Sequence, residues 1–226
     1  MLPSPAIAGL MGIARYAFLA TAAVLSPPLG SFAQTEIPTA SPQTVTWSAA
    51  RKLSHDDFKA AAPKTAKFQS RSWIRIEASW RCISGVLNTT IAAVFDPAQS
   101  WWLGSQWNPW EDVDSRRKWL SRSRADAENK RHIVLSENDL LRHEQLHFDL
   151  AEVTAGKIRR RLAELEGVCA GPDRDAEVEK IVVELTAAFG KEQKVYDDET
   201  AHGTKAQPQH EWETRVERAL VERAMR

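Results

Sequence analysis

The sequence predicts an α+β fold, in which a small antiparallel β-sheet packs against three or four helices. Two observations carry this prediction. Residues 74–82 alternate apolar and polar side chains, which is the pattern of a strand with one face in water. From Ser136 onward, apolar side chains recur every three or four residues, which is the period of an α-helix. We therefore expect strands in the first half of the chain and helices in the second.

The chain begins with the features of an export signal. An apolar run at residues 16–25 is too short to span a bilayer, and the small residues Ser31 and Ala33 occupy the positions that a signal peptidase reads. We predict a signal peptide at residues 1–33 and an exported protein, periplasmic or secreted, without a stable membrane anchor. An uncleaved anchor is the alternative.

After the signal, the sequence predicts one folded domain. Residues 34–43 are polar and contain two prolines, which indicates a disordered lead-in. Residues 44–226 have the length of a single domain. The whole chain has 30 basic and 30 acidic residues. This balance gives no electrostatic footprint for binding nucleic acid, so we expect no such partner.

The strands are predicted mainly in one hairpin. A short strand at residues 44–47 and a helical turn after Ser54 precede it. The hairpin covers about residues 72–96, with a turn at Ser84 and Gly85. Two strands are marginal alone in water, so the hairpin must pack against helices.

Cys82 and Cys169 are the only cysteines. An oxidising compartment allows them to pair, and the alternative is two buried free thiols. Between these residues, five tryptophans fall within residues 101–119. Tryptophan is a core and anchor residue, so this segment is interpreted as a packed loop, with a binding platform as the alternative.

Three helices are predicted after residue 135. Ser136 and Asp139 form a capping pattern at the start of the first. Along one stripe of this helix lie mostly apolar residues together with one glutamate and one histidine. They are Leu140, Glu144, His147, Ala151, Ala155, Ile158, Leu162 and Leu165. A second helix is expected over about residues 175–196 and a last one around residues 212–220. Residues 197–209 are predicted to form a polar loop between them.

The first of these helices carries the strongest functional signal, the sequence His143-Glu144-Gln145-Leu146-His147. Two histidines four residues apart project from the same side of a helix and can share a metal ion. The intervening Glu144 is then placed to take a proton from an activated water molecule. The pattern predicts a zinc site with His143 and His147 as ligands. The alternative is a pair of hydrogen-bonded core histidines.

A third ligand must come from another element. Glu152 follows His143 by nine residues, which is half a revolution, so it faces away from the metal. Residues 196–203 offer one imidazole and three carboxylates. His202 is the predicted third ligand, and Glu199 and Asp197 are the alternatives. A solvated histidine at a helix C-cap is the non-functional interpretation.

Two stretches resemble a bacterial family of predicted secreted zinc-dependent proteases of unknown function. These stretches are LRHEQLHFDLAE at residues 141–152 and YDDETAHG at residues 196–203. The strand region around residues 93–101 is also similar. The resemblance implies His143 and His147 as the metal ligands and Glu144 as the catalytic carboxylate. It also favours His202 as the third ligand. Leu146 departs from the small residue expected there, and residues 102–135 form a longer segment than usual.

The expected function is therefore a secreted zinc metallopeptidase acting on a peptide or protein substrate. Glu144 would act as general base, and Tyr196 is a candidate for stabilising the oxyanion. One alternative is a zinc hydrolase that cleaves a non-peptide amide or ester of the cell envelope. Another is a non-catalytic module that zinc stabilises, in which Glu144 would have no use.

Overall fold

The computed structural model describes residues 44–64, 66–107, 135–165, 169, 171 and 173–224. The predicted signal peptide (1–33) and lead-in (34–43) lie outside the described residues, as do two of the five clustered tryptophans. Within these limits the chain has the predicted α+β architecture. No helix in the described ranges is long and apolar enough to cross a membrane.

The strands and short 3-10 helices all precede the long helices. They are β1 (Val45–Thr46), η1 (His55–Asp57), β2 (Ser70–Arg71), β3 (Ile74–Ile83), β4 (Val86–Phe95), η2 (Pro97–Gln99), β5 (Trp101–Trp102) and η3 (Gly104–Gln106). The helices α2 (Glu137–Ala163), α3 (Arg174–Thr200) and α4 (Ala206–Ala224) follow.

The predicted hairpin is confirmed as β3 and β4, which pair along their full length from Ile74–Phe95 to Ile83–Val86. Ser84 and Gly85 form the turn with positive φ angles of 51° and 79°. The short β1 adds to the other edge of β4, which gives the sheet order β1-β4-β3. The residues at the end of β4 are fully buried and form the sheet side of the core.

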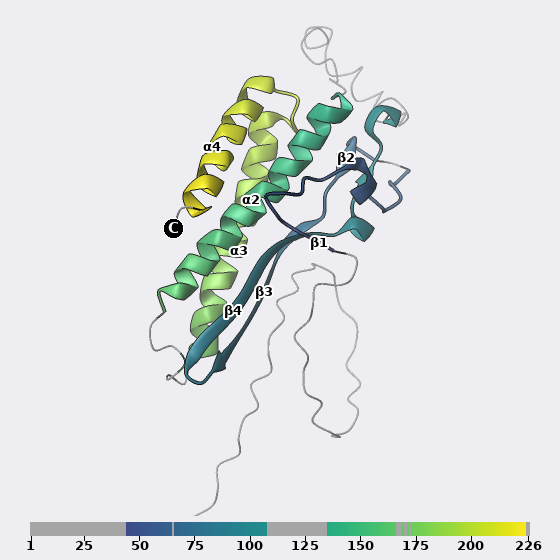
Figure 1. Cartoon of the computed structure of the whole chain (residues 1–226). Helices are drawn as coiled ribbons and strands as arrows, with labels where there is room; N and C mark the ends of the chain where they lie inside the picture. Colours follow the sequence, from purple (N-terminus) through teal and green to yellow (C-terminus); the bar gives the residue numbers. More distant parts are fainter. Residues whose placement is uncertain are drawn as a thin grey trace, which may run out of the picture.

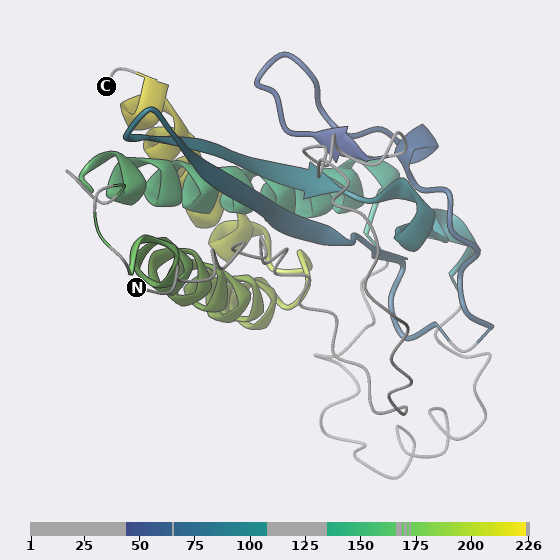
Figure 2. The ribbon, with the colours of Figure 1, turned by 90° about the horizontal axis from the view of Figure 1, so that it is seen from below.

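Helix α2 lies at the centre of the molecule (Figure 1). The sheet covers one side, and α3 and α4 pack on the other (Figure 2). The predicted apolar stripe is buried or half-buried, but further positions such as Phe148, Leu150 and Val153 are buried as well. The prediction of one buried stripe therefore underestimated how many residues of α2 are buried, because other elements pack against more than one face of this helix.

Helix α3 runs four residues further than the sequence predicts. Its last turn is closed by the Thr200 hydroxyl, which donates to the carbonyl of Tyr196. The helix then stops at Ala201, which has a left-handed conformation. Asp197 thus lies on a helix, whereas residues 197–209 were expected to form a loop, and α4 begins earlier than expected, at Ala206.

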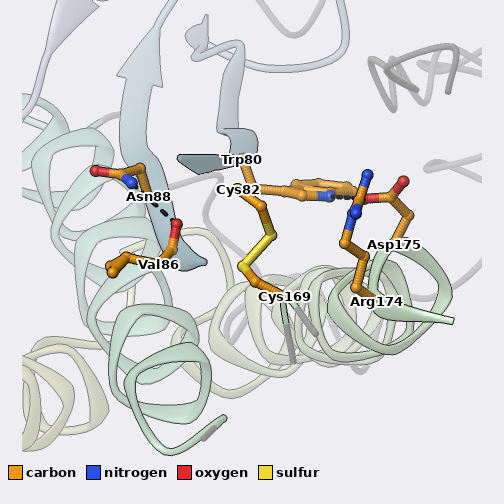
Figure 3. The surroundings of a disulfide bond; sticks show 7 residues. All are labelled: Trp80, Cys82, Val86, Asn88, Cys169, Arg174 and Asp175. Atoms are coloured by element: carbon orange, nitrogen blue, oxygen red, sulfur yellow. Dashed lines mark hydrogen bonds and ion pairs between the residues drawn. A yellow bond between two sulfur atoms is a disulfide. The ribbon is translucent and has the colours of Figure 1, made fainter. Parts of the chain in front are cut away.

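The predicted disulfide between Cys82 and Cys169 is present (Figure 3). It joins the end of β3 to the connection between α2 and α3. Beside it, the indole nitrogen of Trp80 donates to Asp175 at the start of α3 (3.3 Å). Two contacts therefore tie the far end of the hairpin to the helices.

Removing this disulfide should destabilise the fold. The cysteines are 87 residues apart in sequence, and closing a loop of that size is worth about 4 kcal/mol in the loop-entropy description. We expect the Cys82→Ser/Cys169→Ser double variant to lose about this much free energy of unfolding in urea titrations. A loss below about 1 kcal/mol would contradict the prediction.

Candidate metal centre

His143 and His147 lie one turn apart on α2 and face the same side. Their Nε2 atoms are 3.2 Å apart, and His143 is only 3% exposed. A glutamine side-chain oxygen contacts the Nδ1 atom of each ring. Nδ1 of His143 is 3.3 Å from Oε1 of Gln209. Nδ1 of His147 contacts Oε1 of Gln193. A carbonyl oxygen can only accept, so each Nδ1 carries a hydrogen, and in the neutral ring each Nε2 presents its lone pair.

The orientation of Gln193 is fixed independently. Its side-chain nitrogen donates to the backbone carbonyl of His147 (3.0 Å), which turns its oxygen toward the ring. Such outer partners set the tautomer of a metal-binding histidine. Both glutamines come from helices other than α2, so their contribution was not visible in the sequence motif.

Asp197 completes a cluster with the two histidines. Its Oδ1 atom lies 3.3 Å from Nε2 of His143 and 3.0 Å from Nε2 of His147. These three atoms are a group with the spacing of metal ligands among the described residues. Ligands about 2.0–2.1 Å from a tetrahedral zinc lie roughly 3.3 Å from one another, so the observed separations fit such an ion.

The Oδ1 atom of Asp197 is buried and accepts no hydrogen bond. The neighbouring ring nitrogens are close to it but are not aligned as donors. Burying an unsatisfied carboxylate oxygen is costly, and a cation between the three atoms removes that cost. The residues present therefore fit a bound metal.

The charges of this cluster are coupled. Burial alone would raise the pKa of Asp197, but the surrounding histidine rings outweigh it and hold this pKa well below its usual range. Burial likewise favours neutral His147, yet Asp197 and Glu144 raise the pKa of His147 overall. A metal ion at this position would require the neutral ring, so a proton and a metal would compete for it.

His202, the predicted third ligand, lies at the edge of the cluster. Its Nδ1 is 3.3 Å from the same Oδ1 of Asp197, and its side chain is about half exposed. The adjacent carboxylate of Asp197 raises the pKa of His202. Its ring also contacts Phe68, with centroids 4.8 Å apart. The ligand-spaced group contains Asp197, one of the two alternatives, so the assignment of His202 as a ligand stays a prediction.

A strained turn brings His202 to this place. Ala201, His202 and Gly203 have consecutive positive φ angles of 49°, 54° and 81°. Such conformations are unfavourable for residues with a Cβ and cluster at functional sites. A Cβ at Gly203 would lie 3.0 Å from Cγ of His143, so the turn packs directly against the ring of His143.

Gly203→Ala should therefore displace His143 and weaken metal binding, by about 10-fold or more. Gly190→Ala is a matched control, because Gly190 lies in α3 with no atom within 4 Å of an added Cβ. That variant should gain roughly 0.5–1 kcal/mol of stability from helix propensity and keep its metal affinity. Zinc titration with a competing chelator compares the two, and equal affinities would contradict the prediction.

Glu144 is buried beside the histidines, at 5% exposure. Two serine hydroxyls donate to its carboxylate: Ser70 to Oε1 (2.5 Å) and Ser72 to Oε2. Both serines come from the segment before β3, which no sequence pattern connected with the motif. The negative charge of Glu144 also contributes to the raised pKa of His147.

Tyr196, the candidate for oxyanion stabilisation, packs against His143. Its side chain is fully buried, and its hydroxyl contacts Gln209 (2.8 Å) and the backbone carbonyl of His143 (3.2 Å). Burial raises its pKa far above the usual range. Its ring stacks on His143 with centroids 4.7 Å apart. Tyr196 thus packs against the ring and backbone of His143, and its assignment to oxyanion stabilisation stays a prediction.

The remaining candidates have other partners. Glu199 accepts a hydrogen bond from the indole of Trp212 (2.7 Å). Glu152 faces away from the site as expected and pairs with Arg159 (2.6 Å). Of the other histidines, His55 and His210 are exposed, and His132 lies outside the described residues.

Fold and site together define an α+β protein with a His-Glu-x-x-His helix and a candidate metal centre of two histidines and a carboxylate. Residues 116–203 match a family described as a bacterial protein of unknown function (DUF922). The matched range contains the three ligand candidates, Glu144 and His202. No curated protein and no solved structure matches the chain.

Proposed function

We propose that this chain is a zinc-dependent peptidase that works outside the cytoplasm. The observation that carries the proposal is the combination of three ligand atoms at tetrahedral spacing, from one buried and two half-buried residues, with the buried carboxylate of Glu144 on the same helix turn. Zinc fits this set of two imidazoles and one carboxylate, which resembles known catalytic zinc sites with three protein ligands and one open position.

Each residue has a definite task in this proposal. His143, His147 and Asp197 hold the metal, and His202 contacts Asp197 from the exposed side. When bound, the metal supplies a Lewis acid that polarises the scissile carbonyl and lowers the pKa of a water molecule. Glu144 accepts the proton of the attacking water and then donates it to the leaving amine. Gln193, Gln209 and Tyr196 keep the two imidazoles in the ligand tautomer and orientation.

Export is part of the proposal. The disulfide between Cys82 and Cys169 supports it, because such bonds persist in oxidising compartments such as the periplasm. The apolar run at residues 16–25 supplies the corresponding signal.

The buried state of Glu144 favours a catalytic centre over a zinc-stabilised module. A purely structural site has no need for a buried carboxylate that requires two serine hydroxyls to satisfy it, since an apolar residue would fill the space at lower cost. A hydrolase acting on a non-peptide amide or ester would use the same groups, so the substrate class is decided by experiment.

The test is a profile of the peptides released from a denatured proteome by the purified protein. We expect cleavage that stops on adding a chelator and returns on adding zinc. Metal analysis of the same preparation should give close to one zinc per chain. Cleavage that persists unchanged in a chelated, metal-free sample would contradict the proposal. Bound zinc without peptide release, but with hydrolysis of envelope amides or esters, would reassign the substrate.

A further inference from the structure

The serine contacts of Glu144 form a symmetric arrangement. Each carboxylate oxygen accepts one hydroxyl, Oε1 from Ser70 and Oε2 from Ser72. Ser70 is 6% exposed and Glu144 is 5% exposed. Bulk water therefore does not readily replace the hydrogen bond between them. Two donors on two different oxygens fix the plane of the carboxylate as well as its position.

The alternation of the backbone explains why these two serines act together. Successive side chains of an extended segment point to opposite faces, so Ser70 and Ser72 share one face and Gln69 and Arg71 the other. Gln69 anchors the segment: its amide pairs with both the backbone N–H and the carbonyl of Leu135, directly before α2 (2.9 and 3.2 Å). The segment that carries the serines is therefore fixed relative to the helix that carries Glu144.

A second anchor comes from a separate two-stranded sheet, formed by β2 and β5. β2 pairs with β5, with Ser70 opposite Trp102. The indole nitrogen of Trp102 donates to Glu137 in the first turn of α2 (2.9 Å). The serine-bearing strand is thus connected to α2 at two points, which holds the serines at a fixed distance from Glu144.

We propose that Ser70 and Ser72 are positioning residues that hold the Glu144 carboxylate in the orientation needed for proton transfer. This inference rests on the proposed hydrolytic function. A glutamate side chain has three rotatable bonds, and a displacement of about 1 Å at a reacting group costs on the order of 100-fold in rate. The two hydroxyls remove that freedom without touching the metal ligands.

The experiment compares Ser70→Ala, Ser72→Ala and the double variant in the zinc-loaded protein, with a peptide that the wild type cleaves. We expect kcat to fall about 10-fold in each single variant and on the order of 100-fold in the double variant. KM and zinc content should not change, because substrate binding and the ligands are unaffected. Ser70→Thr retains the hydroxyl and suits a strand, so it should restore kcat. Ser79→Ala in the long hairpin is the matched control and should leave kcat unchanged.

Each outcome decides between the inferences. A wild-type protein that binds zinc but hydrolyses nothing overturns both the proposed function and the positioning role. An active wild type with unchanged kcat in the double variant overturns the positioning role alone. Loss of zinc or of the folded state in the alanine variants, with no recovery in Ser70→Thr, shows that the serines stabilise the structure, which also overturns it.

Discussion

Replacing Glu144 by glutamine should abolish hydrolysis while leaving zinc bound. The amide has nearly the same shape as the carboxylate but cannot accept a proton at the reacting pH, and general acid–base catalysis is worth roughly 10²–10⁴-fold. The fold should tolerate the change, because the serine hydroxyls of Ser70 and Ser72 can rotate to accept from the amide as well as donate to it. The measurement is kcat on a wild-type substrate, together with zinc content.

Glu152→Gln is the matched control for this experiment. Glu152 lies on the same helix and is equally buried, at 4% exposure, but its partner is Arg159. The Glu152→Gln variant should lose some stability and retain hydrolysis. If Glu144→Gln cleaves at a near wild-type rate, Glu144 is not the general base.

Asp197→Asn should remove the metal. The substitution keeps the size of the side chain but removes the charge that faces His143, His147 and His202. Outer-shell changes typically cost 10–100-fold in metal affinity, so loss of a charged ligand should cost more than about 100-fold. Competitive zinc titration measures this. Asp198→Asn is the control, because Asp198 is exposed and pairs with Lys194 on the surface, and it should keep zinc.

His202→Ala completes the comparison. With Asp197 as the third ligand, this variant should keep zinc with only modestly weaker affinity, because it loses a contact to the ligand and not the ligand itself. Tight zinc in Asp197→Asn together with loss in His202→Ala would instead assign the third position to His202, as the sequence motif implies.

Local patterns in the sequence were sufficient to predict much of the molecule. The alternation over residues 74–82 predicted β3, the capping pair at Ser136 predicted the start of α2, and the lone cysteines predicted the disulfide. The strand and the helix start depend on residues that are close in sequence, and each cysteine has only one other cysteine to pair with. The spacing of His143 and His147 likewise predicted a shared face, because four residues make slightly more than one helical turn.

Contacts between distant segments could not be predicted in the same way. The end of α3 depends on a hydroxyl–carbonyl contact within its last turn and on the left-handed residues after it, so Asp197 was assigned to a loop. Residues 197–199 are all acidic, and acidic residues at a helix C-terminus oppose the helix dipole, so the charge pattern also argued against a helix that extends this far.

The sequence by itself determined the helix with its histidine pair and buried glutamate, since these follow from helical periodicity. Only the tertiary structure decided what surrounds them. Ser70 and Ser72 reach Glu144 across more than 70 residues of chain, and Gln193, Gln209 and Asp197 arrive from α3 and α4. Polar side chains of these types occur throughout the sequence, and burial against a common centre is what distinguishes these few from the rest, because an unpaired buried polar group is costly.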